Sequence, residues 1–250
     1  MQEPADLVAF YDDAYSRGPE GGELYARWRE LSAVGKAEHV MALCCRAGIS
    51  PRRTLEIGCG DGALLRQLRR MGFGGDLEGV EITELAVEIA ASRPEIDRAW
   101  LYDGLHLQVR DGAYDLAILS HVLEHVPDPA PLLAEAARAA GAVLVEVPLE
   151  QNWSARRPGK REHAAEVGHL QRLDREGARA IVRAAGLKVA GEIEDPLPLS
   201  VHLFFAESPA RRAAAALRWG VRASLYRLAP AVARRVFTLH YACLCLPPGG

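Results

Sequence analysis

The stretch Thr54-Leu55-Glu56-Ile57-Gly58-Cys59-Gly60-Asp61-Gly62 joins a short apolar run to a helical pattern through a turn rich in glycine. The run predicts a buried strand over 54–57, and the pattern after it predicts a helix over 63–71. Glycine leaves the backbone of such a turn bare, so a nucleotide can approach it closely at the edge where parallel strands end. The stretch therefore predicts a cofactor site between the first strand and its helix.

Strand and helix patterns alternate along the rest of the chain. Strands are expected over 77–82, 99–102, 114–120, 142–147, 187–193 and 238–246, and helices over 83–92, 131–140 and 174–185. This alternation predicts an α/β fold with a Rossmann-like, doubly wound and mainly parallel sheet. Residues 1–50 carry apolar side chains at helical spacing, which predicts an N-terminal helical cap.

The composition is that of a folded protein: of 250 residues, 49% are hydrophobic, which is enough for a substantial core. No apolar run reaches the roughly 20 residues of a membrane-spanning helix, and the acidic N-terminus lacks a signal-peptide core. The five cysteines are odd in number and have no C-x-x-C spacing, which disfavours disulfides and zinc sites. We therefore expect a cytoplasmic location, and the net charge of -3 gives no reason to expect a nucleic acid partner.

Glu81 ends the second predicted strand, where its carboxylate can accept hydrogen bonds from both hydroxyls of a ribose. Gly58, Gly60 and Ala63 also match the G-x-G-x-x-G/A fingerprint of NAD-binding proteins, and Glu81 follows about 20 residues on, as that fingerprint requires. An NAD-dependent oxidoreductase is therefore an alternative. The two acidic residues of the glycine-rich stretch disfavour a pyrophosphate and favour a nucleoside that carries a sulfonium and an ammonium group.

Four segments resemble, in order and spacing, the motifs of class I S-adenosylmethionine-dependent methyltransferases of the type that acts on small molecules. Glu56–Gly62 resembles the E/D-x-G-x-G-x-G loop, and the likeness continues through Gly79–Ile82, Tyr102–Gly104 and Tyr114–Val126. The resemblance implies S-adenosylmethionine as the cofactor and methyl transfer to an oxygen, nitrogen or carbon nucleophile of a small molecule. A noncatalytic protein that binds S-adenosylmethionine is a further alternative.

The resemblance also implies which residues hold the cofactor: Glu56, Gly58, Gly60, Gly62, Glu81, Ile82, Asp103, Gly104, Ser120 and His121. The glycines would face the methionine part, Glu81 the ribose and Asp103 the adenine amino group. Ser120 and His121 would face the sulfonium end. Because the sulfonium is already a reactive methyl donor, the protein chiefly aligns donor and acceptor, and a hydroxyl acceptor also calls for a general base.

We expect four parts along the chain: a helical cap over 1–50, a cofactor-binding core over 51–206, a basic helical insertion over 207–236, and a final antiparallel core strand with a tail over 237–250. Tyr11, Tyr15 and Trp28 of the cap either pack inside it or close over the substrate. The sequence leaves the oligomeric state open.

The insertion carries arginines and, after Glu207, no acidic residue: Arg211, Arg212, Arg218, Arg222, Arg227, Arg234 and Arg235. Its apolar residues, among them Leu217 and Leu228, recur toward one side at helical spacing, which predicts a solvated pair of helices. The alternatives are a cradle for an anionic substrate or a partner subunit, and a surface that adsorbs to anionic membranes.

The segment His121-Val122-Leu123-Glu124-His125 matches H-x-x-E-H, the zinc motif of a group of metalloproteases. Zinc proteolysis needs both imidazoles on one face of an uninterrupted helix. Here a strand precedes the motif directly, and Pro127 and Pro129 permit only a short helical turn. We therefore assign no metal to this segment. Glu124 and His125 are expected to fix the turn beneath the cofactor or to contact substrate, which makes His125 a catalytic candidate.

Residues 150–172 are polar with little periodicity and predict a long loop, a feature that is often functional. His163 and His169 in this loop resemble the segment that small-molecule methyltransferases place after a Val-Pro strand end, here Val147-Pro148. A histidine there can deprotonate a hydroxyl of the acceptor, because its ordinary pKa is near neutrality. We predict His169 as the general base, and the alternative is a loop histidine held by hydrogen bonds.

Overall fold

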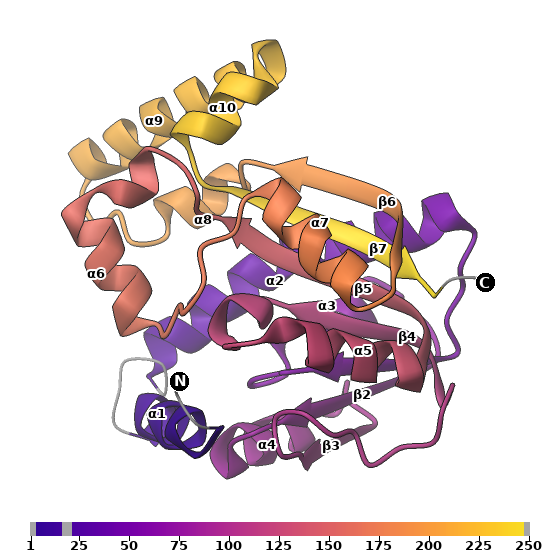
Figure 1. The fold of residues 1–250 in the computed structure, drawn as a ribbon. Helices are drawn as coiled ribbons and strands as arrows, with labels where there is room; N and C mark the ends of the chain where they lie inside the picture. The colour runs from indigo at the N-terminus through magenta and orange to yellow at the C-terminus, as the bar shows by residue number, and fades with distance from the viewer. Residues whose placement is uncertain (1–3, 17–21, 248–250) are drawn as a thin grey trace.

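The computed structural model describes residues 4–16 and 22–247. Its centre is a seven-stranded sheet with strand order β3-β2-β1-β4-β5-β7-β6 (Figure 1). The strands are β1 Arg53–Ile57, β2 Asp76–Glu81, β3 Arg98–Leu101, β4 Tyr114–Ser120, β5 Ala140–Leu149, β6 Lys188–Asp195 and β7 Leu239–Leu246. Every neighbouring pair is parallel except the two that β7 forms, with β5 and β6, which are antiparallel. The predicted Rossmann-like sheet with an antiparallel final strand is confirmed.

Helices cover both faces of this sheet (Figure 1). One face packs against α2 Glu23–Ala47, α3 Ala63–Arg70 and α4 Glu84–Ala91, and the other against α5 Pro129–Ala139 and α7 Arg175–Ala184. Strand β4 is buried by both layers, with Leu116 and Ile118 in one core and Ala117 and Leu119 in the other. A strand buried on both faces has a continuous apolar sequence, which is why the pattern over 114–120 predicts it so well.

The described part of the predicted cap is helical: α1 Pro4–Ser16 is followed by α2. Residues 1–3 and 17–21 of this cap lie outside the described residues. Within 4–16 and 22–247, no helix has both the length and the apolar character that crossing a membrane requires.

Residues 150–172 do not form the long loop that their polarity predicts. They contain a 3-10 turn, η3 Ser154–Arg156, and a helix, α6 Pro158–Glu166. Proline suits the first turn of α6, but Ala164 alone is buried along this helix, so it has no apolar stripe for a periodicity argument to detect. A second short helix, α8 Leu199–Leu203, is likewise absent from the sequence prediction.

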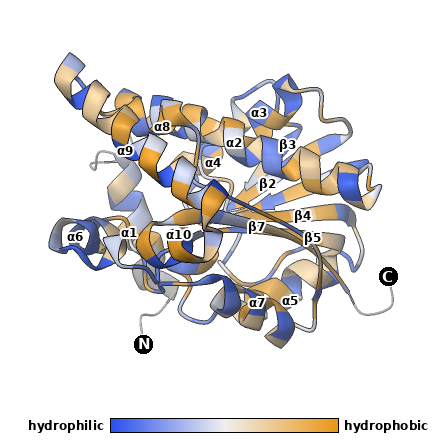
Figure 2. Ribbon diagram, turned by 90° about the horizontal axis from the view of Figure 1, so that it is seen from above, coloured by the Kyte–Doolittle hydropathy of each residue, from blue (hydrophilic) through white to orange (hydrophobic). Residues whose placement is uncertain are grey.

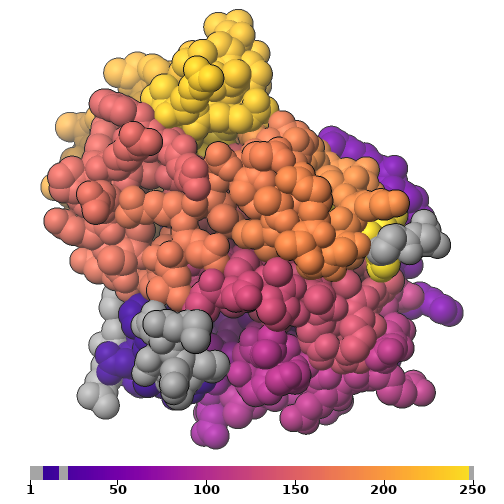
Figure 3. All heavy atoms as spheres, in the orientation of Figure 1, coloured from indigo at the N-terminus to yellow at the C-terminus, as the bar shows by residue number. Residues whose placement is uncertain are grey.

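The basic segment forms α9 Pro209–Leu228 and α10 Pro230–Val236, and the end of α9 together with α10 forms the top of the molecule in the view of Figure 3. On α9, Leu217 and Leu228 point outward, since they are 72% and 86% exposed. Figure 2 shows polar and apolar residues in alternation along α9. The helix docks instead through Trp219 and Tyr226, which donate hydrogen bonds to backbone carbonyls at and beyond the end of β6.

Glu192 on β6 anchors α7 to the edge of the sheet. It accepts hydrogen bonds from Arg175 and Arg179 of α7 and from the Tyr241 hydroxyl of β7. The hydrogen bonds from Arg179, Tyr241 and Arg175 outweigh burial and lower the pKa of Glu192 to about 2. The ionised Glu192 therefore stabilises the folded protein at pH values above the ordinary pKa of 4.5. This stabilisation is lost as the pH falls toward 2.

We predict that Glu192→Gln lowers the free energy of unfolding at pH 7 by about 1 to 2 kcal/mol. The lowered pKa of Glu192 corresponds to about 3 kcal/mol, and solvent screens part of this stabilisation. Urea unfolding at pH 7 and at about pH 3 measures this, and the variant should lose less stability between the two than the parent protein. Glu176→Gln is the matched control, since this exposed carboxylate of α7 also pairs with arginines. Equal losses in both variants would contradict a specific role for the Glu192 cluster.

Candidate functional site

The glycine-rich turn lies between β1 and α3, as predicted. Gly58, Gly60 and Gly62 have φ angles of 73°, 52° and 76°, in the left-handed region that favours glycine. A Cβ atom on Gly60 would lie 2.8 Å from the Tyr15 hydroxyl, and one on Gly58 would lie 2.7 Å from a Val122 methyl group. The turn therefore presents bare backbone at positions where side chains do not fit, as a closely held cofactor requires.

Glu81 ends β2 beside this turn, and its carboxylate binds two backbone amides. The Gly60 amide donates to Oε2 at 2.9 Å, and the Ile82 amide donates to Oε1 at 2.5 Å. Burial raises the pKa of Glu81, and these two amides oppose the rise. Each oxygen has a second lone pair, so the carboxylate can hold the turn and also accept hydrogen bonds from two ribose hydroxyls.

The acidic residues of the turn carry less free charge than the sequence suggests. Asp61 is 2% exposed and forms ion pairs with Arg29 at 3.0 Å and Arg93 at 3.2 Å. Glu56 is 3% exposed, and burial together with neighbouring carboxylates raises its pKa to about 8. Neither acid therefore presents a free negative charge to a ligand. Contrary to the sequence prediction, their charge does not explain a preference for S-adenosylmethionine over NAD.

Asp103 and Gly104 lie in the turn after β3. Asp103 accepts hydrogen bonds from the amides of Leu105 and His106 at 2.8 and 2.6 Å. Burial opposes them, but these contacts and the His106 ring lower the pKa of Asp103. A Cβ on Gly104 would meet Ile82 at 3.5 Å, so the predicted contacts at the ends of β2 and β3 are adjacent.

Several buried polar atoms at the carboxyl edge of the sheet have no hydrogen-bond partner among the described residues. They are Ser120 Oγ, Glu56 Oε2, Glu146 Oε2 and both carboxylate oxygens of Glu124. His121, next to Ser120, has a φ of 59°, which is rare for a residue other than glycine. Native structures leave few buried polar atoms unpaired, so their concentration at this edge indicates a place for a ligand.

The predicted catalytic residues His125 and His169 lie side by side, with ring centroids 4.8 Å apart. His125 Nδ1 is 2.6 Å from the Tyr11 hydroxyl, and His169 Nδ1 is 2.8 Å from Glu150 Oε2. Burial lowers the pKa of His125. Burial acts the same way on His169, but the contact with Glu150 outweighs it and raises the pKa of His169 above 6.5.

Helix α1 contacts both the glycine-rich turn and the segment that carries the predicted base. Tyr15 lies over the turn, and Phe10 and Tyr11 lie over Gly168, where an added Cβ would meet them at 2.9 and 3.3 Å. Trp28 does not join them, because its ring faces an aromatic ring after α8. A single helix therefore covers the two halves of the site.

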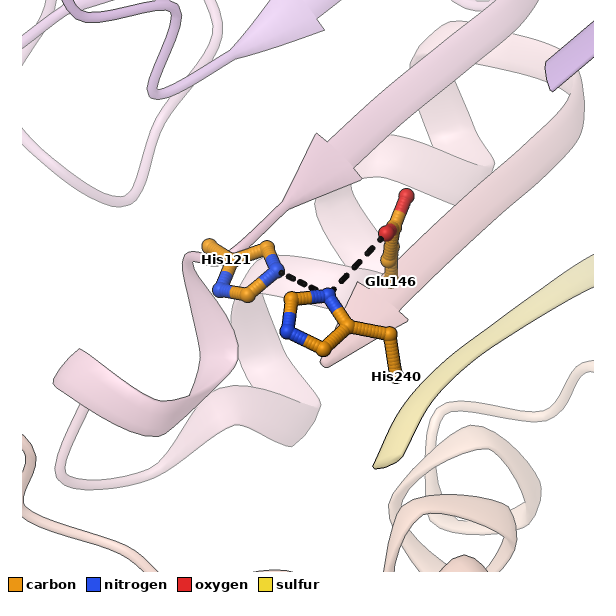
Figure 4. A group of neighbouring side chains, drawn as sticks. All are labelled: His121, Glu146 and His240. Atoms are coloured by element: carbon orange, nitrogen blue, oxygen red, sulfur yellow. Dashed lines mark hydrogen bonds and ion pairs between the residues drawn. The ribbon is translucent and has the colours of Figure 1, made fainter. Parts of the chain in front are cut away.

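A second histidine cluster lies next to the first, and no sequence motif predicts it. His121 Nε2 is 3.1 Å from His240 Nδ1, which is 3.6 Å from Glu146 Oε1 (Figure 4). His39 lies between Glu146 at 3.4 Å and Asp195 at 3.0 Å. Burial raises the pKa of Glu146, but the contacts with His240 and His39 outweigh burial and hold this pKa well below its ordinary range. One feature of the sequence could have predicted this cluster. Glu146 is an acidic residue in the otherwise apolar sequence of β5, and a buried charge requires partners.

The H-x-x-E-H segment does not form the metalloprotease arrangement. Leu123–His125 is a single 3-10 turn, η2, which agrees with the short helical turn that the two prolines predict. His121 lies against His240, whereas His125 lies against His169. The two imidazoles of the motif therefore belong to different clusters and do not share one helix face.

Residues 25–191 match a family model described as a methyltransferase domain, which covers more than half of the chain. The chain belongs to the class I S-adenosylmethionine-dependent methyltransferases. The matched region contains the glycine-rich turn, Glu81 and Ser120. The cofactor is S-adenosylmethionine, and this finding decides against NAD where the charge argument fails.

A ubiquinone biosynthesis O-methyltransferase from Thiobacillus denitrificans is 30% identical over 127 residues, which are 46% of this chain and 54% of that protein. The chain spans about half the length of the curated relatives it matches.

Solved structures share the fold of this methyltransferase. A geranyl diphosphate C-methyltransferase from Streptomyces coelicolor A3(2) has a TM-score of 0.65, 16% sequence identity and 97% coverage of both chains. The [4+2]-cyclase SpnF has a TM-score of 0.56 and 19% identity, and the match covers 79% of this chain and 76% of that one. At such identities the likeness concerns the fold alone, and the fold is shared by proteins named for different reactions.

Proposed function

We propose that this methyltransferase transfers the methyl group of S-adenosylmethionine to an oxygen atom of a small molecule. The observation that carries the proposal is the pair His169–Glu150, which lies with His125 beneath the same helix that covers the glycine-rich turn. S-adenosylmethionine supplies a methyl group on a sulfonium that needs no further activation. The chain's own residues hold it through the turn and Glu81, and the buried Ser120 hydroxyl, which has no hydrogen-bond partner among the described residues, is available to its sulfonium end.

The carboxylate-held histidine favours an oxygen acceptor over a nitrogen one. A hydroxyl must lose its proton as its oxygen takes the methyl carbon, and a base whose pKa is near the working pH serves best. An amine can enter already unprotonated and gains less from a base. The name of the Thiobacillus denitrificans relative, an O-methyltransferase, agrees with this assignment.

We predict that the purified protein binds S-adenosylmethionine and its demethylated product, and does not bind NAD. The cradle of bare backbone and the carboxylate of Glu81 suit a nucleoside, and the family identifies which one. Isothermal titration calorimetry with the three ligands measures this. Micromolar binding of NAD with no response to S-adenosylmethionine would overturn the proposed function.

Turnover is tested by incubating the protein and S-adenosylmethionine with a mixture of hydroxyl-bearing metabolites. Mass spectrometry then searches for products heavier by one methyl group. Cofactor binding without any methylated product would favour the noncatalytic alternative. The [4+2]-cyclase has the same fold and is named for a different reaction, so the fold alone does not imply methyl transfer.

The outward face of α9 supports a membrane surface as a second partner. Leu217, Val221 and Leu228 are exposed, and so are Arg218 and Arg227 on the same helix. Exposed apolar residues with basic neighbours are typical of helices that adsorb to anionic bilayers. A cytoplasmic location and the four-part organisation also belong to this proposal, and the free thiols of the cysteines support a reducing compartment.

We predict that replacing Arg218 and Arg227 together by glutamine weakens adsorption to phosphatidylglycerol vesicles about 30-fold, since each basic residue near an anionic surface contributes about 1 kcal/mol. Cosedimentation measures the bound fraction, and phosphatidylcholine vesicles are the control. Arg222 is left in place because it is partly buried against Phe237. If the variant and the parent protein sediment equally and bind the cofactor equally, α9 is a solvated helix that does not bind membranes.

A further inference from the structure

We propose that His121, Glu146 and His240 bind a divalent transition-metal ion at the carboxyl edge of the sheet. Figure 4 shows the two imidazoles and the carboxylate directed toward one another from three separate segments of the chain. Their ligand atoms all lie within 4.8 Å of one another. The 3.1 Å between His121 Nε2 and His240 Nδ1 is close to the separation of about 3.3 Å for two nitrogens that each bind one zinc ion at about 2.0–2.1 Å.

Glu124 lies behind His121 and favours the tautomer of its ring that can bind a metal ion. Its Oε1 is 3.1 Å from His121 Nδ1, an ion-pair distance without hydrogen-bond geometry. A carboxylate at this place favours the tautomer with the proton on Nδ1, which leaves the lone pair on Nε2, the atom that faces His240. Metal-binding histidines commonly have a carboxylate behind them in this way.

With that tautomer, more acceptors than protons meet at the centre of the cluster. The single proton that His240 Nδ1 can carry faces His121 Nε2 at 3.1 Å and Glu146 Oε1 at 3.6 Å. The other oxygen of Glu146 is buried and has no hydrogen-bond partner within the described part of the chain. A metal ion in place of the shared proton binds all three lone pairs, and two histidines with one carboxylate suit Zn²⁺, Mn²⁺ or Fe²⁺ better than Mg²⁺ or Ca²⁺.

His39 orients the carboxylate from its other side. Its Nδ1 lies 3.4 Å from Glu146 Oε1, and its Nε2 lies 3.0 Å from Asp195 Oδ2. Both nitrogens of His39 therefore face carboxylates, so it positions Glu146 and is not itself a ligand. The left-handed backbone of His121 is an unfavourable conformation, and such conformations persist mainly at functional sites.

The role of the ion, unlike its binding, rests on the proposed function. Ser120 pairs with Glu146 across β4 and β5, so the cluster lies one strand from the predicted sulfonium end. A hydroxyl near a divalent ion loses its proton more easily. The acceptor proton would pass to His169 or to water, the oxygen would take the methyl carbon, and the electron pair of the broken carbon–sulfur bond would stay on sulfur. The acceptor class is then a hydroxyl compound.

Equilibrium dialysis of the metal-stripped protein against Zn²⁺ or Mn²⁺, followed by elemental analysis, tests the site without any methyl acceptor. We expect one ion per chain and a loss of affinity of about 100-fold or more in His240→Gln. His106→Gln, an exposed histidine that also contacts a carboxylate, and His169→Gln of the neighbouring cluster should keep the affinity of the parent protein. Circular dichroism verifies that each variant is folded.

Absence of binding, or unchanged affinity in a folded His240→Gln, would overturn the proposal. So would a loss confined to His169→Gln, which would place the ion at the other histidine cluster. Calorimetry with S-adenosylmethionine on the same samples keeps the two proposals apart. A protein that binds the cofactor but no ion refutes the metal site alone, and one that binds the ion but no cofactor refutes the proposed function alone.

Discussion

His169→Gln is expected to lower the single-turnover rate of methyl transfer by about 10²- to 10⁴-fold and to leave the affinity for S-adenosylmethionine unchanged. Glu150 holds Nδ1 of the ring at 2.8 Å, so Nε2 is the nitrogen left to take a proton from a hydroxyl. Glutamine can keep the contact with Glu150 but cannot accept the proton. Rapid-quench measurement at saturating cofactor, with the acceptor found by the mass screen, gives the rate.

His163→Gln is the matched control, because this exposed histidine of α6 is close in the chain and pairs only loosely with Glu166 at 3.8 Å. It should change the rate less than about twofold, as expected for a surface substitution. A loss below about fivefold in His169→Gln would reduce His169 to a residue that packs the segment. Simultaneous loss of cofactor binding would instead identify a structural histidine that keeps the site closed.

The pH profile gives the same hypothesis a second test. A general base acts in its unprotonated form, so the rate should increase with pH through the raised pKa of His169. Glu150→Gln removes the contact that raises this pKa, and the acid limb of the profile should therefore move to lower pH. A histidine with a purely structural role would change the size of the rate and leave the position of that limb where it was.

The sheet could be predicted because its signals are local. The apolar run of β4 reflects burial on both faces, and the positive φ angles of Gly58 and Gly60 explain why glycines follow β1. The sequence did not predict α6, because Ala164 alone is buried along this helix and its sequence therefore has no apolar stripe. The leucines of α9 were expected to share a side, but no local pattern tells whether that side meets protein or solvent, and Leu217 faces solvent.

The prediction of the cofactor residues rests on contiguous motifs, whereas the second histidine cluster is assembled by topology. His39 and Glu146 are 107 residues apart and meet through the packing of α2 on the sheet. His240 joins them because β7 lies between β5 and β6 and places it opposite Pro148 in the register. The pairing of Asp61 with arginines has the same long-range origin, so the sequence could not show that this carboxylate is already neutralised.

Glu81→Ala is expected to weaken S-adenosylmethionine binding by about 1.5 to 3 kcal/mol, the range for lost hydrogen bonds to a charged group, or about 10- to 150-fold in dissociation constant. The carboxylate has two tasks, since it accepts the Gly60 and Ile82 amides and keeps lone pairs for the ribose. The alanine variant removes both, and calorimetry measures the sum.

Glu81→Gln separates the two tasks. The amide oxygen can still accept the Gly60 hydrogen bond, but the amide nitrogen can accept neither the Ile82 amide nor a ribose hydroxyl, so affinity should fall to a value between the parent protein and Glu81→Ala. Glu84→Ala, an exposed carboxylate at the start of α4, is the control and should bind as the parent does. If Glu81→Gln binds normally while Glu81→Ala does not, the carboxylate only holds the turn. If both fold and bind normally, Glu81 takes no part in cofactor binding, and the ribose contact predicted from the sequence is wrong.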